Sequence, residues 1–263
     1  MVDTSPPSSS GTEPNLRRKR RIYLLPNLFT TAALFGGFYA IIAALNVHYI
    51  HAAVAIFFAA VMDGLDGRVA RWTRTATEFG KEYDSLSDVV AFGLAPAIVM
   101  YRWAFVPFLH ETGNVARWGW LAAFFYTAAA ALRLARFNVR SQALDKRYFQ
   151  GLPSPAAAGL MASLVWLLVS WSNEPWTMIP AWLATMGCGV LMVSPIPYYS
   201  FKDLSLSEHV RFRWAIVIPL LLIVIAISPP KMLFASLFCY ALSGPAIGLW
   251  RRWFRHRRSG FIP

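Results

Sequence analysis

Long apolar runs constrain the fold of this chain more than any other feature of its sequence. A run of about 20 apolar residues is long enough to cross the hydrocarbon core of a bilayer as a helix. Several such runs are present, and 57% of the 263 residues are hydrophobic while only 14% are charged. An ordinary soluble domain carries roughly 25% charged residues. The sequence therefore predicts an all-α fold, a polytopic membrane helix bundle.

The apolar runs predict about eight transmembrane helices. They are expected at approximately 28–46, 50–70, 84–106, 118–135, 155–172, 176–194, 214–228 and 231–250. Several of these runs are short or interrupted by proline, so their bounds are given to within several residues. An even number of spans places both termini on the same side of the membrane.

The basic residues indicate which side that is. With both termini in the cytoplasm, all but three of the 25 Lys and Arg fall on the inner side, the exceptions being Arg102, Arg117 and Lys231. This asymmetry is what the positive-inside rule predicts. The net charge of +12 is then explained by contact with anionic lipid headgroups, and a nucleic-acid partner is not expected.

Four aspartates lie between two of the most apolar runs, in the stretch DGLDGRVARWTRTATEFGKEYDSLSD. Asp63 and Asp66 are three residues apart at the inner end of the second predicted helix, and Asp84 and Asp88 are four apart at the start of the third. Helical residues three or four apart share a face. The short connection between the helices should fold back and bring both pairs together as a four-carboxylate cluster.

Carboxylates held that close cannot all stay ionised in a partly desolvated site unless cations accompany them. The expected cofactor is therefore a divalent metal. Oxygen ligands favour Mg²⁺ or Mn²⁺, with Ca²⁺ as a further candidate, and the lack of nearby His or Cys disfavours zinc. Four carboxylates suffice for two ions, an arrangement used in phosphoryl transfer. Between them, Gly64, Gly67 and Ala70 leave room for a substrate, and Arg71 offers donors suited to a diphosphate.

Two other interpretations of these acids are weaker. Acids at a helix end can be solvated, or can pair with Arg68, Arg71 and Arg74, but two spaced pairs in a membrane segment favour a functional site because intramembrane acids are costly. A cation transporter would also need buried carboxylates. Such transporters usually bind ions near the midplane between two repeats, and no second half of this chain repeats the acids.

At these residues the sequence resembles the CDP-alcohol phosphatidyltransferase family, whose signature is D-x2-D-G-x2-A-R-x8-G-x3-D-x3-D. All eight fixed positions match: Asp63, Asp66, Gly67, Ala70, Arg71, Gly80, Asp84 and Asp88. The resemblance implies a helical membrane enzyme, usually a homodimer, with an active site open to the cytoplasm. The transmembrane catalytic domain is expected over 22–250. The composition of the flanking segments predicts a disordered basic tail over 1–21 and a basic cytoplasmic tail over 251–263.

The resemblance also implies roles for individual residues. Asp63, Asp66 and Asp84 would bind the metals, while Asp88 would complete the second metal site and act as the base toward the acceptor alcohol. The CDP part of the donor would be lined by Gly67, Ala70, Arg71 and Gly80. The expected location is the bacterial cytoplasmic (inner) membrane, crossed several times.

Further segments resemble the membrane-embedded bacterial branch of this family that uses L-serine. They are LLPNLFTTAALFGGFYAI (24–41), DSLSDVVAFGLAPA (84–97), ALRLARFNV (131–139), FQGLPSPAAAG (149–159) and YYSFKDL (198–204). The resemblance covers most of 22–204 and implies CDP-diacylglycerol and L-serine as substrates. Glycerol 3-phosphate, inositol phosphate and choline remain alternative acceptors, because basic and aromatic residues are too abundant here to exclude them.

Several residues are weaker candidates. Arg133, Arg136 and Asn138 are suited to the carboxylate of the acceptor, but the arginines are equally suited to anchoring the helix at the interface. Asn27 is expected to cap the first membrane helix, with nucleotide contact as the alternative. Lys81 is expected to meet a lipid or substrate phosphate. The loop 150–155 either covers the site or forms a rigid turn.

Overall fold

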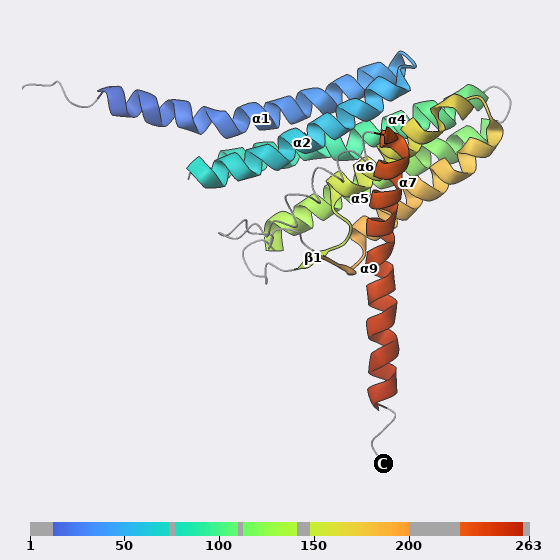
Figure 1. Ribbon diagram of the computed structural model, residues 1–263. Coiled ribbons are helices and arrows are strands. Elements are labelled where there is room, and N and C mark those ends of the chain that lie inside the picture. Colours follow the sequence, from blue (N-terminus) through green and yellow to red (C-terminus); the bar gives the residue numbers. More distant parts are fainter. Residues whose placement is uncertain (1–12, 74–76, 110–112, 141–147, 200–226, 260–263) are drawn as a thin grey trace, which may run out of the picture.

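The computed structural model describes residues 13–73, 77–109, 113–140, 148–199 and 227–259 (Figure 1). In chain order the first elements are α1 (Glu13–Leu45), α2 (Tyr49–Thr73), α3 (Glu78–Asp88), the π-helix η1 (Val89–Leu94), α4 (Ala95–Ala104) and the 3-10 turn η2 (Val106–Phe108). They are followed by α5 (Gly113–Arg140), β1 (Tyr148–Gln150), α6 (Ser154–Leu168) and the 3-10 turns η3 (Val169–Trp171) and η4 (Pro175–Thr177). The last elements are α7 (Met178–Val193), β2 (Pro197–Tyr199) and α9 (Pro229–Ser259).

Five helical segments in the described residues are long and apolar enough to cross a membrane. They are Pro26–Leu45, Tyr49–Thr73, Glu78–Ala104, Ser154–Trp171 and Pro175–Val193. Helices α5 and α9 cover the predicted segments 118–135 and 231–250, although neither is among these five. The predicted span 214–228 lies almost entirely outside the described residues. The helical bundle is therefore confirmed, whereas the expected count of eight spans is not.

Two helices begin earlier than the sequence predicts. Helix α1 begins at Glu13, so part of the segment 1–21, which we expected to be disordered, is helical. The third membrane helix begins at Glu78 rather than near Asp84, because the Thr77 side chain caps it by accepting a bond from the Gly80 N–H at 3.0 Å. Asp84 and Asp88 consequently lie in the second and third turns of a formed helix instead of at a frayed end.

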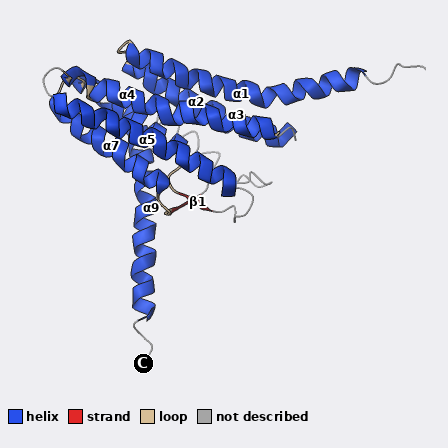
Figure 2. Ribbon diagram, turned by 180° about the vertical axis from the view of Figure 1, so that it is seen from behind, coloured by secondary structure: helices blue, strands red, loops and turns tan. Residues whose placement is uncertain are grey.

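Small residues bring α1 and α2 close together along one edge of the bundle, where Figures 1 and 2 show them side by side. Ala40, Ala44, Ala52 and Ala59 are fully buried in this contact. A Cβ added to Gly37 would lie 2.6 Å from the Cα atom of Ala91, so η1 also touches the α1 backbone. Membrane helices pack through such small residues because lipid gives no hydrophobic force between them.

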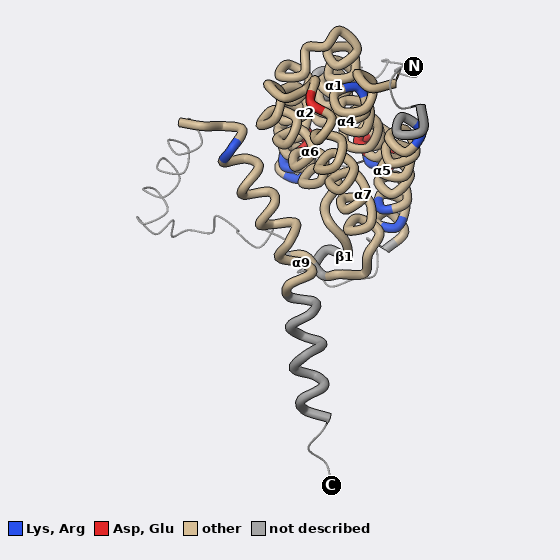
Figure 3. Tube along the Cα trace, turned by 90° about the vertical axis from the view of Figure 1, so that its right-hand side faces the viewer, with Lys and Arg blue, Asp and Glu red and all other residues tan. Residues whose placement is uncertain are grey.

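The bundle carries few charges along its length, as Figure 3 shows. Its core is apolar and includes Ile56, Phe92, Met100, Trp103 and Tyr126, each less than 2% exposed. Many large apolar side chains, such as Phe35 and Phe124, are instead exposed on the bundle surface. Exposed apolar side chains around a packed core are typical of a protein whose surface is solvated by lipid.

A short antiparallel ribbon, which the all-α prediction did not include, connects the later helices. Strands β1 and β2 pair Tyr148 with Tyr199 and Gln150 with Pro197. Gly151 follows with a φ of +82°, and a Cβ there would overlap the Met192 carbonyl. Its N–H donates to the Ile196 carbonyl at 2.9 Å. The loop 150–155 therefore begins as a rigid turn held against the end of α7, in agreement with one of its two predicted roles.

Candidate active site

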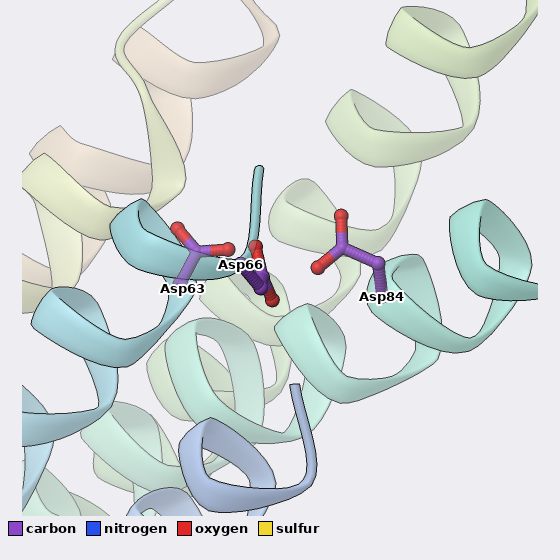
Figure 4. Close-up of side chains that lie close together, drawn as sticks. All are labelled: Asp63, Asp66 and Asp84. Atoms are coloured by element: carbon purple, nitrogen blue, oxygen red, sulfur yellow. The ribbon is translucent and has the colours of Figure 1, made fainter. Parts of the chain in front are cut away.

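Three of the four predicted aspartates form a compact group between α2 and α3. One carboxylate oxygen from each of Asp63, Asp66 and Asp84 lies within 4.8 Å of the other two. In Figure 4, Asp66 lies between Asp63 and Asp84, whose side chains project toward it from either side. The helical spacings explain this arrangement, because each pair shares one face of its helix.

Asp88 adjoins this group, and its direct carboxyl contact is with Asp63. Its carboxyl group is in hydrogen-bonding contact with that of Asp63, and those of Asp66 and Asp84 are in similar contact. Two carboxylates in direct contact repel each other unless they share a proton or a cation. The four aspartates thus form two touching pairs, with Asp88 on the side of Asp63.

Helix α1 holds the cluster in place. The hydroxyl of Thr30, which is only 4% exposed, donates to Asp66 Oδ2 at 2.8 Å. Ser87 on α3 donates its hydroxyl proton to the Thr30 carbonyl at 3.1 Å. Thr30 therefore ties α1 to both helices that carry the aspartates.

The donor set fits a hard divalent cation. All ligand atoms in the group are carboxylate oxygens, the type that Mg²⁺, Mn²⁺ and Ca²⁺ prefer. Asp84 Oδ1 is buried and has no hydrogen-bond partner among the described residues. A buried carboxylate oxygen without a partner is unfavourable, and a bound cation would remove that penalty. The cluster is accordingly a candidate metal site.

A pocket adjoins the cluster between α1, α2 and α3. It is lined by Pro26, Asn27, Thr30, Asp66, Gly67, Ala70, Thr77, Gly80, Lys81 and Asp84. Five of the six residues predicted to contact CDP-diacylglycerol line it: Asn27, Gly67, Ala70, Gly80 and Lys81. A Cβ on Gly67 would meet no protein atom within 4 Å, so this side of the pocket is open for a ligand.

Two of those six residues differ from expectation. Asn27 does not cap a helix, because α1 runs through it from Glu13; Pro26, which suggested a helix start, lies inside the helix. The Asn27 side chain faces the pocket instead, where its Oδ1 would lie 3.4 Å from a Cβ on Gly80. Arg71 does not line the pocket. It is exposed, and its Nε donates to the Gly67 carbonyl at 2.8 Å.

The three residues predicted to bind the carboxylate of the acceptor differ in their partners and in their distance from the aspartates. Arg133 faces Asp63 and Asp88 and donates from its Nη1 to the hydroxyl of Ser154, while its buried Nε has no partner among the described residues. Arg136 donates to the Val193 carbonyl at 2.9 Å, and Asn138 donates to the Ser85 hydroxyl at 2.8 Å. Arg133 alone of the three combines proximity to the aspartates with an unused donor.

The comparison with known families agrees with this geometry. The CDP-alcohol phosphatidyltransferase family model matches residues 23–193, which include α2, α3 and all four aspartates. This chain belongs to that family. The described parts of α1 and α5 that contact the aspartates also lie inside the matched region.

Curated relatives within the CDP-alcohol phosphatidyltransferase family share one name. A Helicobacter pylori protein named CDP-diacylglycerol–serine O-phosphatidyltransferase is 37% identical over 70% of this chain and 75% of its own length. A protein of the same name from Mycobacterium leprae is 31% identical over 92% of this chain and 80% of its own. One from Bacillus subtilis is 31% identical over 72% of this chain and 98% of its own.

Sequence reasoning missed two residues that lie beside the predicted site residues. Thr30 reaches Asp66 from another helix, and Tyr240 on α9 lies close enough to Arg133 to influence it electrostatically. Thr30 lies in the segment 24–41 that resembles the serine-using branch, but no fixed position of the signature indicates its contact with Asp66. Tyr240 lies outside every segment of that resemblance.

Replacing Thr30 by Val is expected to weaken metal binding about 10- to 100-fold, the usual effect of removing a side chain that orients a metal ligand. The substitution keeps the shape of the side chain and removes the hydroxyl that donates a hydrogen bond to Asp66. The measurement is Mn²⁺ affinity by electron paramagnetic resonance, together with the Mn²⁺ concentration that gives half-maximal activity. Thr185→Val is the control, because Thr185 is equally buried and bonds only to the Ala181 carbonyl. Equal affinity in the Thr30 variant and the control would contradict the role given to Thr30.

Proposed function

We propose that this chain transfers the phosphatidyl group of CDP-diacylglycerol to the hydroxyl of L-serine, giving phosphatidylserine and CMP. The observation that carries the proposal is the pairing of two features around one carboxylate cluster. A pocket lined by residues predicted to contact the nucleotide lies beside Asp66 and Asp84, and a partly buried arginine, whose buried Nε has no partner among the described residues, lies beside Asp63 and Asp88. Relatives at 30–38% identity carry the corresponding name.

The carboxylates would hold the cofactor. Asp63, Asp66 and Asp84 offer three carboxylate oxygens close together, and Asp88, which contacts Asp63, would add a fourth carboxylate, so the cluster would suit two divalent ions, Mg²⁺ or Mn²⁺. When bound, such ions supply Lewis-acid stabilisation of the charge on phosphoryl oxygens. Thr30 fixes the orientation of Asp66 toward them.

The donor would bind in the pocket between α1 and α3. Gly67, Ala70 and Gly80 are small enough to leave room for the nucleotide in this pocket. Asn27 would present its amide to the nucleotide, and Lys81, which also lines the pocket, would meet a phosphate. Arg71, which is exposed, would swing from the Gly67 carbonyl to the diphosphate. The acyl chains extend into the bilayer.

The acceptor would bind on the opposite side of the cluster. Arg133 pairs with the carboxylate of L-serine and so places its hydroxyl near Asp88. Asp88 takes the hydroxyl proton as the serine oxygen forms a bond to the phosphorus that carries diacylglycerol. The bond from that phosphorus to the CMP oxygen breaks, and CMP leaves with the bonding electrons. Most of the rate enhancement in this scheme comes from positioning and electrostatics.

The membrane setting extends the same proposal. The chain would lie in the bacterial cytoplasmic membrane as a homodimer, with the site and both termini on the cytoplasmic side. Residues 22–250 would form the catalytic domain between a basic tail over 1–21 and another over 251–263. The asymmetry of Lys and Arg in the sequence supports this orientation.

The deciding experiment follows CMP release from CDP-diacylglycerol by the detergent-purified protein. L-serine, glycerol 3-phosphate, inositol phosphate and choline are compared as acceptors, each with Mg²⁺, Mn²⁺ or a chelator. Release with serine that the chelator abolishes is the expected result. Release only with another alcohol would overturn the serine assignment and leave the family chemistry intact. No release with any acceptor would overturn the enzymatic proposal and favour cation transport instead.

A further inference from the structure

A proline interrupts the helix that carries Asp84 and Asp88. In a regular α-helix the carbonyl of residue 92 accepts a hydrogen bond from the N–H of residue 96. Residue 96 is Pro96, which is buried and has no N–H to donate. In a membrane segment the carbonyl left over must find another donor, because lipid offers none.

The helix responds by widening into a π-helix. Segment η1 runs from Val89 to Leu94, directly after Asp88, and the Ala95 N–H donates to the Val90 carbonyl five residues earlier. The Phe92 carbonyl accepts a hydrogen bond from the Tyr126 hydroxyl on α5 at 2.9 Å, and Tyr126 is fully buried. Tyr126 thus gives a backbone carbonyl a donor in the segment where Pro96 has no N–H.

Close packing holds α5 at the distance this bond needs. A Cβ on Gly93 would lie 3.3 Å from the Cβ of Ala130 on α5, so η1 and α5 are nearly in backbone contact. On the opposite side of η1, Gly37 meets Ala91 with no room for a larger residue. The π-helical turn is therefore enclosed from both sides.

The π-helix sets the direction in which Asp88 points. One residue more or less in a helical turn rotates everything on one side of it by about 100°. Helix α4 cannot take up that rotation, because Val99, Met100 and Trp103 are each at most 1% exposed. A return of η1 to α-helical geometry would instead turn α3 and move the Asp88 carboxyl away from Asp63.

We propose that Tyr126 is a positioning residue for Asp88: its hydroxyl bond to the Phe92 carbonyl, made necessary by Pro96, holds the π-helix that aims Asp88 at Asp63. The proposal rests on the function proposed above, in which Asp88 takes the proton of the acceptor. Tyr126 itself belongs neither to the carboxylate group nor to the residues that line the pocket.

The test compares Tyr126→Phe, Pro96→Ala and the double variant. Tyr126→Phe removes the donor and is expected to lower both the unfolding temperature in detergent and kcat, the latter on the order of 10²-fold because the base is misplaced, with KM for CDP-diacylglycerol unchanged. Pro96→Ala restores an N–H that can close the α-helix onto the Phe92 carbonyl. In the double variant this N–H should restore the unfolding temperature while kcat stays low.

Tyr49→Phe is the matched control, because the Tyr49 hydroxyl donates to the Arg102 carbonyl between α2 and α4 at 3.1 Å. It should lower the unfolding temperature and leave kcat unchanged. Recovery of kcat together with the unfolding temperature in the double variant would overturn the proposal, since Tyr126 would then act only on stability. An unchanged kcat in Tyr126→Phe would also overturn it.

Measurements on the wild-type protein distinguish a failure of this proposal from a failure of the function on which it rests. If it releases no CMP with serine but does so with another alcohol, the serine assignment fails and the same variants are measured with that alcohol. If it turns over no acceptor, both proposals fail together. If it is active and the variants do not follow the expected pattern, only the role of Tyr126 fails.

Discussion

Substituting Asp88 by Asn is expected to reduce turnover with L-serine by about 10²- to 10⁴-fold, the range that general-base catalysis contributes. The amide has nearly the same shape as the carboxyl group and cannot take the proton of the acceptor hydroxyl. Asp88 meets the cluster through Asp63 and is not part of the compact group of three, so CDP-diacylglycerol should still bind. The unfolding temperature should not fall, because the change removes one of several crowded carboxylates.

The measurement is kcat and KM from CMP release at saturating Mn²⁺, beside a thermal unfolding curve. Glu82→Gln is the matched control, since Glu82 lies on the same helix and is exposed. It should behave as the wild type. A turnover number for Asp88→Asn within a fewfold of the wild type would show that another group takes the proton.

Substituting Arg133 by Gln is expected to raise KM for L-serine about 10- to 100-fold, because a hydrogen bond to a charged group contributes about 1.5–3 kcal/mol. KM for CDP-diacylglycerol should stay the same, since Arg133 does not line the nucleotide pocket. Arg133→Lys keeps the positive charge near Asp63 and Asp88 but loses the forked donor, so it should show a smaller increase.

Arg136→Gln distinguishes the two candidate arginines. Its bond to the Val193 carbonyl holds α5 against the end of α7, so the substitution should lower stability without changing KM for serine. If KM for serine rises in the Arg136 variant and not in the Arg133 variants, Arg136 and not Arg133 binds the carboxylate of serine.

The aspartate cluster could be predicted from the sequence because its geometry is mostly local. A spacing of three in α2 and of four in α3 places each pair of aspartates on one helical face. The connection between the two helices is only a few residues long, so the helices lie side by side. The contact of Asp63, Asp66 and Asp84 confirms that part of the prediction. The sequence did not indicate that the direct contact of Asp88 would be with Asp63.

The remaining features depend on contacts between helices, which local patterns do not reveal. Asn27 was interpreted as a cap because Pro26 resembles a helix start, yet a proline is also tolerated inside a membrane helix when neighbours satisfy the freed backbone groups. The π-helix had a visible sequence cause in Pro96. Its second requirement is a hydroxyl on α5 within hydrogen-bonding distance of the Phe92 carbonyl, and this becomes evident only when α5 is placed beside η1.

The order in which the site is encoded along the chain has a consequence for its biogenesis. The proposed metal ligands and the proposed nucleotide pocket are built from residues between Pro26 and Asp88, so their contacts are close in sequence and are expected to form early. Arg133, which we propose for the acceptor, comes from the later helix α5. During synthesis, which proceeds from the N-terminus, the donor half of the site can assemble before the acceptor half has left the ribosome. An incompletely inserted chain would then have a nucleotide pocket but no means of placing an alcohol beside it.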